Sequence, residues 1–365
     1  MTEMSQDVVA EVRGQVGFIT LNRPKAINAL SLGMVRDLLA QLLAWKNDPQ
    51  VLAVAIRGSN KEGVFGHFCA GGDIRFLHQA GSTGNPELED FFTEEYALNH
   101  LIFTYPKPYI AFMDGIVMGG GMGISQGASV RLVTEKTKMA MPETIIGLFP
   151  DVGGGYFLSR CPGAVGEWLA LTGDTIGAAE AIAFNLADAY VPSAEQSQLW
   201  EALATQTFAD GDAVQAFVRL QAATPAPGAV RDVAEINQVF ALPSVQAMIN
   251  TLEADGASEW AQATATVLRK RSPLMLFVVL EQIRRARHMD VASDLRMERD
   301  MVRYCFYLRP GQSETVEGIR ALAVDKDHAP QWNPAHIEDV PEDLWKSFFV
   351  SPWPAHSHPL AALKD

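Results

Sequence analysis

The chain has 365 residues, of which 48% are hydrophobic and 20% charged, and its formal net charge at pH 7 is −14. This composition is typical of a globular protein, and the length allows one large domain or a domain with an appendage. The negative charge argues against non-specific nucleic-acid binding, because such binding needs a basic face that displaces phosphate counterions. It does not exclude an anionic ligand, since backbone N–H groups and a few Lys or Arg side chains can bind phosphates locally.

The three cysteines, Cys69, Cys161 and Cys305, are widely separated and form no C-x-x-C motif. A disulfide framework or a structural zinc site is therefore not expected. The eight histidines are scattered, and we expect neither a metal ion nor a cofactor. Residues 1–10 contain acids and no apolar run, and no apolar stretch is long enough to span a bilayer. We therefore expect a cytoplasmic protein without a membrane partner.

The first half of the sequence alternates short β-rich runs with helical patterns. The runs that predict strands are 16–21, 52–56, 109–113 and 130–133. Between the first two runs, Ser31 is an expected N-cap, and apolar residues follow it at helical spacing, at Met34, Leu38, Leu42 and Trp45. Strand, turn and helix in repetition predict an α/β fold in which function lies on the turns.

From about residue 200 onward, helical patterns dominate the sequence. The predicted helices are 200–208, 212–221, 243–255, 259–271 and 273–289. We therefore predict two domains, a core over residues 1–200 and a mainly helical C-terminal region over residues 201–365.

Two glycine-rich segments, 68–74 (FCAGGDI) and 114–123 (DGIVMGGGMG), suggest that the backbone approaches a ligand closely. The second lies between a predicted strand and a small-residue stretch, so its N–H groups can begin a helix and point at an anion. One N–H from each segment, converging on one oxygen, would form an oxyanion hole. Two tight turns without a binding role explain either segment alone equally well. A dinucleotide site is not expected, because the glycines at 119–123 lack its spacing.

A third segment, 141–155, supplies ionisable groups. Glu143 and Asp151 lie there in an otherwise apolar loop that is punctuated by Gly and Pro. Carboxylates in apolar surroundings tend to have raised pKa values and can act as bases or nucleophiles. Taken alone, the segment favours a simpler interpretation, a solvated Glu143 and an Asp151 that caps the following helix.

Together with residues 21–30 (LNRPKAINAL), these three segments resemble the crotonase, or enoyl-CoA hydratase/isomerase, superfamily over about residues 10–190. Four motifs in the same order make the resemblance specific. It implies a spiral core of repeated ββα units that binds an acyl-CoA. It also implies that the thioester carbonyl lies between the N–H groups of Gly72 and Gly120. The residues that would line CoA are Asn28, Ala29, Leu30, Ala70 and Ile74.

A missing carboxylate indicates the branch within the superfamily. Hydratases carry two glutamates, one of them at the end of the second glycine run, where this chain has Gly123. The chain resembles the 3-hydroxyisobutyryl-CoA hydrolase family instead, and Glu95 matches a substrate-contacting glutamate of that family. The segments that carry this resemblance are 92–96, 118–123, 141–144 and 147–158.

The C-terminal region resembles the same family. Residues 317–321 (EGIRA) and 325–327 (DKD) follow the family's ending, although each charge taken singly could be a helix cap or a surface pair. The chain departs from the family at Thr315 and Val316, where an aromatic residue and an acid are more common, and it matches only loosely over 200–260. These departures affect the expected acyl specificity more than the expected reaction.

The resemblance implies hydrolysis of an acyl-CoA thioester, most specifically 3-hydroxyisobutyryl-CoA in valine catabolism, with Glu143 and Asp151 as catalytic residues. Glu143 is either a nucleophile that forms an anhydride or the base that activates water, and the sequence leaves both open. Glu95 is expected to bond the hydroxyl end of the acyl group, and Gly120, Glu143 and Asp151 to contact the substrate as well. Two alternatives remain, hydration or isomerisation of a double bond, and non-catalytic binding of acyl-CoA. We expect a monomer or a small homo-oligomer.

Overall fold

The computed structural model describes residues 6–62, 65–222 and 226–364. The chain folds into two compact units, each built from three segments of the sequence. Unit 1 comprises residues 1–72, 97–140 and 175–231, and unit 2 comprises residues 73–96, 141–174 and 232–365. The division into domains at residue 200 stays a prediction.

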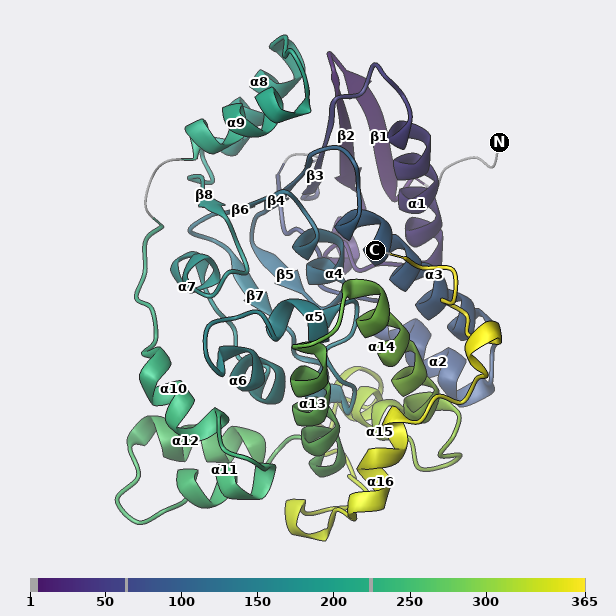
Figure 1. Cartoon of the computed structure of the whole chain (residues 1–365), viewed down its shortest axis with the longest axis vertical. Helices are drawn as coiled ribbons and strands as arrows, with labels where there is room; N and C mark the ends of the chain where they lie inside the picture. The colour runs from purple at the N-terminus through teal and green to yellow at the C-terminus, as the bar shows by residue number, and fades with distance from the viewer. Residues whose placement is uncertain (1–5, 63–64, 223–225, 365) are drawn as a thin grey trace. The chain divides into compact units, whose positions relative to one another are not determined.

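Unit 1 is built on a six-stranded sheet with the strand order β1-β2-β3-β4-β6-β8 (Figure 1). The edge strand β1 runs antiparallel to β2, and the other neighbours are parallel. The strands are β1 (Val8–Arg13), β2 (Val16–Leu21), β3 (Ala53–Gly58), β4 (Tyr109–Met113), β6 (Val130–Val133) and β8 (Ala189–Tyr190). The four runs predicted from the sequence are β2, β3, β4 and β6.

A second, two-stranded sheet pairs β5 (Ile116–Met118) with β7 (Lys138–Ala140) in parallel. Cys69 adds a parallel bridge to Val117 of this sheet. Consecutive strands therefore alternate between the sheets, since β4 and β6 belong to the first and β5 and β7 to the second. This alternation, with a helix after β5, is the repeated ββα arrangement that the family resemblance implied, and the predicted fold class is confirmed.

Helix α1 (Leu32–Lys46) begins where it was predicted to begin, because the Ser31 hydroxyl oxygen accepts the Met34 N–H at 3.3 Å. Its predicted apolar face is buried. A Cβ atom at Gly17 of β2 would lie 2.6 Å from the Trp45 ring, so the glycine lets α1 approach the sheet closely.

The core of unit 1 lies against one face of the larger sheet. Phe18, Ala55, Ile110 and Val130 stand in register across four neighbouring strands and are buried. Helices α8 (Gln196–Thr205) and α9 (Gly211–Gln221) cover this row, and the Trp200 ring lies 4.7 Å from the Phe18 ring between centroids. Unit 1 also contains η1 (Pro24–Ala26), α4 (Gly120–Gln126) and α7 (Ala178–Ala183).

Unit 2 is mainly helical, as predicted for the C-terminal part of the chain. Helix α13 packs against α5 and α6 and is buried along most of its length. The α-helices of unit 2 are α2 (Ile74–Thr83), α5 (Gly154–Leu158), α6 (Val165–Thr172), α10 (Val233–Phe240), α11 (Val245–Leu252), α12 (Glu259–Leu268), α13 (Pro273–Ala286), α14 (Val291–Phe306), α15 (Glu314–Ile319) and α16 (Glu342–Lys346). Shorter elements are η2 (Glu143–Ile146), η3 (Arg320–Val324), η4 (Ile337–Asp339), η5 (Ser347–Phe349) and η6 (Ala355–Ser357). The boundary between the units falls within α3 (Glu87–Phe103).

Helix α14 has no counterpart among the predicted helices. Its charged residues interrupt the apolar pattern by which the other helices were recognised, yet Asp294, Glu298 and Arg299 are buried. Asp294 and Glu298 bond the backbone of residues 153–156, and Arg299 follows them in the sequence.

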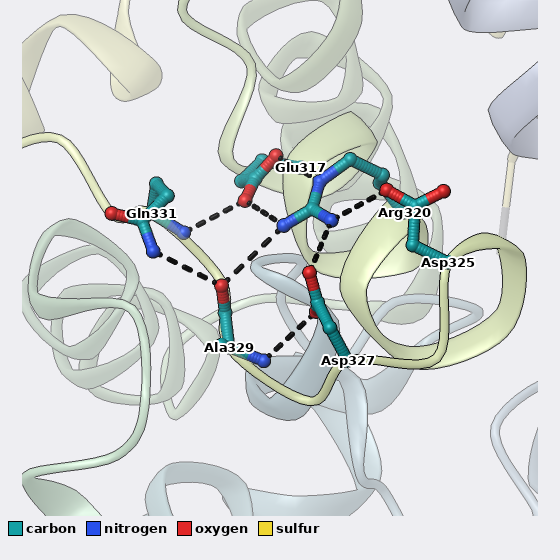
Figure 2. A network of polar contacts seen from close by, with 6 residues as sticks. All are labelled: Glu317, Arg320, Asp325, Asp327, Ala329 and Gln331. Atoms are coloured by element: carbon teal, nitrogen blue, oxygen red, sulfur yellow. Dashed lines mark hydrogen bonds and ion pairs between the residues drawn. The ribbon is translucent and has the colours of Figure 1, made fainter.

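The C-terminal segment with the sequence EGIRA…DKD folds into a polar network centred on Arg320 (Figure 2). The Arg320 guanidinium donates to Glu317 at 2.7 and 2.8 Å, and to Asp325 and Asp327 at 2.7 Å each. Glu317 also accepts the backbone N–H of Gln331 at 2.7 Å. Glu317, Asp325 and Asp327 therefore share the one Arg320 guanidinium rather than forming separate surface pairs.

Candidate active site

Three predicted site carboxylates belong to unit 2. Glu95 lies on α3, Glu143 is the first residue of η2, and Asp151 lies in the loop before α5. Their exposed fractions are 2%, 7% and 6%. The alternative of a solvated surface Glu143 is therefore wrong, because the surrounding apolar loop encloses the side chain.

The hydrogen bonds of these carboxylates are incomplete. Asp151 Oδ2 accepts the Tyr96 hydroxyl at 2.9 Å. Glu95 Oε1 and Glu143 Oε2 are buried and have no hydrogen-bond partner among the residues that the structure describes. A buried polar atom without a partner is costly, so both oxygens are suited to bond a substrate or a water molecule.

Burial raises the pKa values of all three acids, and neighbouring negative charge raises those of Glu95 and Glu143 further. Burial raises the pKa of Asp151 to about 7, although the hydrogen bond from Tyr96 opposes this effect. The pKa of Glu143 is raised well above its usual range by burial, and further by the charges of Asp151 and Glu95. Burial and the Asp151 charge likewise raise the pKa of Glu95. Buried acids with raised pKa values are suited to proton transfer.

Asp151 does not cap the following helix, so that alternative is also wrong. The N-cap of α5 is Gly153. The N–H groups at the start of α5 are bonded by acids of α14 instead. Glu298 accepts the N–H groups of Gly153 at 2.8 Å and of Gly155 at 3.0 Å. The Asp151 carboxylate is thereby left free to accept the Tyr96 hydroxyl.

Helix α15 packs against η2, which begins with Glu143. A Cβ atom at Gly318 would lie 2.4 Å from the Ile146 carbonyl carbon, so this glycine permits the close approach. The Thr315 hydroxyl donates to the Gly147 carbonyl at 2.8 Å. Thr315, one of the departures from the family pattern, is therefore a direct support of the turn that follows Glu143.

The two glycine-rich segments meet within unit 1. A Cβ atom at Gly71 would lie 3.7 Å from the Gly120 nitrogen, and one at Gly121 would lie 2.5 Å from the Cys69 carbonyl oxygen. Gly120 is the first residue of α4, as the sequence predicted, so its N–H has no acceptor within the helix. Gly72 lies beside Leu30 in a parallel bridge. The oxyanion hole itself stays a prediction, but its two segments are adjacent.

Four of the five residues expected to line CoA lie together in unit 1, around the bond from Leu30 N–H to the Gly71 carbonyl at 2.8 Å. The Asn28 side chain is buried, accepts the Arg23 N–H, and donates to two carbonyls. It therefore holds the loop that carries Ala29 and Leu30. Ala70 donates to the Ile27 carbonyl at 3.0 Å. The fifth residue, Ile74, begins α2 in unit 2.

Sequence reasoning missed Tyr96, Gln282, Asp294 and Glu298. The four-residue spacing of Asp294 and Glu298 within an apolar helical pattern was the available signal, since acids on a buried helix face need buried donors.

The fold and these side chains define an acyl-CoA enzyme of the crotonase type. The sequence pattern of the enoyl-CoA hydratase/isomerase family matches residues 16–349, and the chain belongs to this family.

Its relatives include a mitochondrial 3-hydroxyisobutyryl-CoA hydrolase of Xenopus tropicalis, 40% identical over 344 residues, which cover 93% of this chain and 87% of the relative. The 3-hydroxyisobutyryl-CoA hydrolase 1 of Arabidopsis thaliana is 39% identical, with 96% of this chain and 92% of the relative covered. A solved structure, a carnitinyl-CoA dehydratase from Mycobacterium thermoresistibile, has a TM-score of 0.86 and 38% identity, with 96% of this chain and 98% of that chain covered. Among the described residues, no helix is both long and apolar enough to cross a membrane.

Proposed function

We propose that this chain hydrolyses an acyl-CoA thioester and that its substrate is 3-hydroxyisobutyryl-CoA, which yields CoA and 3-hydroxyisobutyrate. The observation that carries the proposal is the buried Glu143, which has one oxygen without a hydrogen-bond partner among the described residues and a pKa raised by burial and by Asp151. The identity of 36–40% to curated hydrolases over most of the chain supports the substrate.

Hydrolysis adds the oxygen of water to the thioester carbonyl carbon, breaks the C–S bond and returns a proton to the CoA thiolate. In this proposal the N–H groups of Gly72 and Gly120 bond the carbonyl oxygen, each stabilising the developing negative charge by about 3 kcal/mol. Glu143 then acts in one of two ways. It attacks the carbonyl carbon to form an anhydride that water opens, or it takes a proton from the attacking water.

Asp151 and Glu95 have supporting roles in the proposal. Asp151, oriented by Tyr96, positions water or the acyl hydroxyl and takes part in proton transfer together with Glu143. Glu95 accepts the 3-hydroxyl of the substrate. A site built to bond a hydroxyl penalises an analogue that lacks it, so 3-hydroxyisobutyryl-CoA should react with a higher kcat/KM than isobutyryl-CoA. Equal values for the two thioesters would contradict the role of Glu95.

A cavity in unit 1 supports the binding of CoA. It has a volume of about 550 Å³, and its lining includes Ile27, His67 and the lysines Lys61, Lys136 and Lys138. On a chain with a net charge of −14, three ammonium groups around one cavity favour a ligand with phosphate groups. Ile27 of this lining immediately precedes the Asn28–Leu30 loop, which carries three of the residues expected to line CoA.

Hydration is the competing function, since similar solved structures include a carnitinyl-CoA dehydratase and an enoyl-CoA hydratase from Rhodobacter sphaeroides 2.4.1, the latter with a TM-score of 0.82 and 35% identity. Gly123 argues against it, because the second glutamate of hydratases is missing at this position. The buried carboxylates argue against non-catalytic binding of acyl-CoA. Burying them lowers the stability of the fold, and binding alone does not require them.

The deciding experiment follows free thiol release and absorbance of the enoyl thioester together, across 3-hydroxyisobutyryl-CoA, isobutyryl-CoA and an α,β-unsaturated acyl-CoA. Hydrolysis predicts thiol release with the hydroxyacyl substrate. Loss of enoyl absorbance without thiol release would identify a hydratase, and no change in either signal would leave only binding.

We further propose that the reaction needs no metal or cofactor, because Glu143 supplies the nucleophile or base and the N–H groups of Gly72 and Gly120 stabilise the developing negative charge, the two tasks that a metal ion performs in other hydrolases. Activity should therefore survive treatment with a chelator. We propose a monomer or small homo-oligomer located in the cytoplasm. A stable hexamer in sedimentation at low micromolar concentration would contradict the proposed monomer or small homo-oligomer. Fractionation of cells tests the compartment, which the names of the vertebrate relatives give as mitochondrial for those proteins.

A further inference from the structure

The turn that follows Asp151 has an unusual backbone. Val152 has a φ of +58°, a left-handed conformation that is rare for a β-branched side chain. Gly153, the next residue, also has a positive φ, of +86°. Such a conformation at a non-glycine residue persists only when its surroundings hold it in place. The groups that hold this turn are therefore of interest for Asp151.

Three side chains from α13 and α14 bond this turn. Glu298 accepts the N–H groups of Gly153 and Gly155 through its two different oxygens, at 2.8 and 3.0 Å. Asp294 accepts the Tyr156 N–H at 2.8 Å. The Gln282 amide donates to the Pro150 carbonyl at 2.6 Å and to Glu298 at 3.2 Å. The bonded positions thus bracket Asp151 and Val152 on both sides.

We propose that Glu298, assisted by Asp294 and Gln282, is a positioning residue that holds Val152 in its left-handed conformation and thereby aims the Asp151 carboxylate. This inference rests on the proposed function for the role of Asp151 in the reaction. It adds a requirement to that function, because α14 contributes to the reaction without touching the substrate.

The chemistry of the group explains why an acid stands at this position. A carboxylate has two acceptor oxygens and therefore satisfies two N–H groups at once, whereas an amide has one acceptor oxygen and one donor nitrogen. Asp294 and Glu298 are both buried, and burial raises the pKa values of both, that of Asp294 to about 7. Two buried acids are a costly way to fill a core, and the backbone N–H groups of the turn are what compensates for them.

The glycine at position 155 leaves room for Asp294 beside the turn. A Cβ atom at Gly155 would lie 2.3 Å from Asp294 Oδ1 and 3.1 Å from Ala286 Cβ. The glycine therefore allows the Asp294 carboxylate to lie against the backbone of α5. Gly155 thus permits the contact with α14.

The first variant that tests the proposal is Glu298→Gln, which keeps the size of the side chain but places an amide NH₂ group against an N–H of the turn. We expect Val152 to relax to a negative φ and Asp151 to shift, with a loss in kcat of about 100-fold, since a displacement of about 1 Å has this effect. KM should change less than about threefold, because ground-state binding of the CoA ester does not involve Asp294 or Glu298. A purely structural role would lower the melting temperature without this division between kcat and KM.

A second substitution provides a rescue. In the double variant Glu298→Gln/Val152→Gly, glycine adopts a positive φ without strain, so the driving force for relaxation is removed. We expect at least a tenfold recovery of kcat relative to Glu298→Gln alone. Val152→Gly alone should retain activity near that of the unchanged protein. Absence of any recovery would contradict the proposed link through Val152.

The matched control is Glu167→Gln, which changes a buried acid of unit 2 that is paired with Arg287 and lies outside this turn. Its kcat should stay within threefold of the unchanged protein. If Glu298→Gln does not fold, Gln282→Leu removes the bond to the Pro150 carbonyl, and we expect a loss in kcat of about tenfold. Full activity of either folded variant would overturn the proposal.

Failure of this inference and failure of the proposed function can be told apart. If the unchanged protein releases no thiol, the proposed function fails. The crystal structure of Glu298→Gln still tests the positioning, by the φ of Val152 and the distance from Tyr96 to Asp151. An unchanged turn in that structure would overturn the inference, whatever the activity.

Discussion

The Tyr96 hydroxyl donates a hydrogen bond of 2.9 Å to Oδ2 of Asp151, between residues that are 55 positions apart in the sequence. Both side chains are buried. Burial raises the pKa of Asp151 to about 7, while the Tyr96 bond stabilises the carboxylate form and so lowers the same pKa. Tyr96 therefore helps set the pH at which Asp151 becomes charged.

Replacing this tyrosine should move the pH profile of the reaction. Tyr96→Phe removes the donor, so the pKa of Asp151 rises further and the acidic limb of kcat/KM shifts to higher pH. The shift should be about one pH unit, since a hydrogen bond to a charged group contributes about 1.5 kcal/mol and one unit corresponds to about 1.36 kcal/mol. Rates measured from pH 5 to 9 test this. A midpoint that stays in place, or moves to lower pH, would show that Asp151 does not control that limb.

The buried Asp151 should also cost stability at high pH. Its folded pKa of about 7 lies above the ordinary aspartate value of 3.8, so between these values the folded protein binds more protons than the unfolded chain. The free energy of unfolding therefore falls as pH rises through this range. Asp151→Asn cannot ionise and should lose activity, yet at pH 8 it should be more stable by up to about 4 kcal/mol. Denaturant unfolding at pH 4 and pH 8 measures this difference in stability, which should be much smaller at pH 4. If Asp151→Asn is destabilised equally at both pH values, the raised pKa of Asp151 is contradicted.

The central test of the mechanism is Glu143→Gln. The amide keeps the shape of the side chain but can serve neither as nucleophile nor as base, so kcat should fall by several orders of magnitude. Binding of the CoA ester, measured by calorimetry, should change little, because the lost interaction belongs to the transition state.

Glu167→Gln is the control for Glu143→Gln as well, since it also replaces a buried glutamate of unit 2 by an amide of the same size. Thiol release is measured under single-turnover conditions for both variants. A Glu143→Gln rate above about a tenth of normal, a loss below about 1.4 kcal/mol, would exclude Glu143 as the catalytic carboxylate.

The oxyanion hole can be tested without changing a polar side chain. A Cβ atom at Gly121 would lie 2.5 Å from the Cys69 carbonyl oxygen, so Gly121→Ala forces the two glycine segments apart. Loss of one N–H donor at the carbonyl oxygen should lower kcat by about 100-fold. Gly33→Ala in α1 is the control, since its nearest neighbour would be Ser31 Oγ at 3.8 Å. Equal activity of the two folded variants would rule out a role for this contact.

Local signals in the sequence were sufficient to predict where some helices begin. Ser31 followed by apolar residues at helical spacing predicted the start of α1, and the glycines at 119–123 predicted the start of α4. These predictions succeeded because caps and glycine turns depend on nearby residues. The burial of Glu143 could not be derived in this way, since an acid in an apolar loop is compatible with either a solvated or a buried position.

The contribution of α14 was not predicted, for a different reason. Asp294 and Glu298 contact Gly153, Gly155 and Tyr156, which are more than 130 positions earlier in the sequence. Local patterns carry no information on which buried donors will meet a buried acid. The charges of α14 instead weakened the apolar periodicity by which a helix is recognised.

The order in which the chain is synthesised gives this long-range contact a biological consequence. Glu298 follows Gly153 by 145 residues, so the segment with both catalytic carboxylates leaves the ribosome well before the helix that supports it. A premature stop after residue 231 would yield a polypeptide that retains Glu143 and Asp151 but lacks the third segment of unit 2. Nonsense mutations anywhere before Glu298 should therefore abolish turnover, and newly made protein should become active only after α14 has been released and folded.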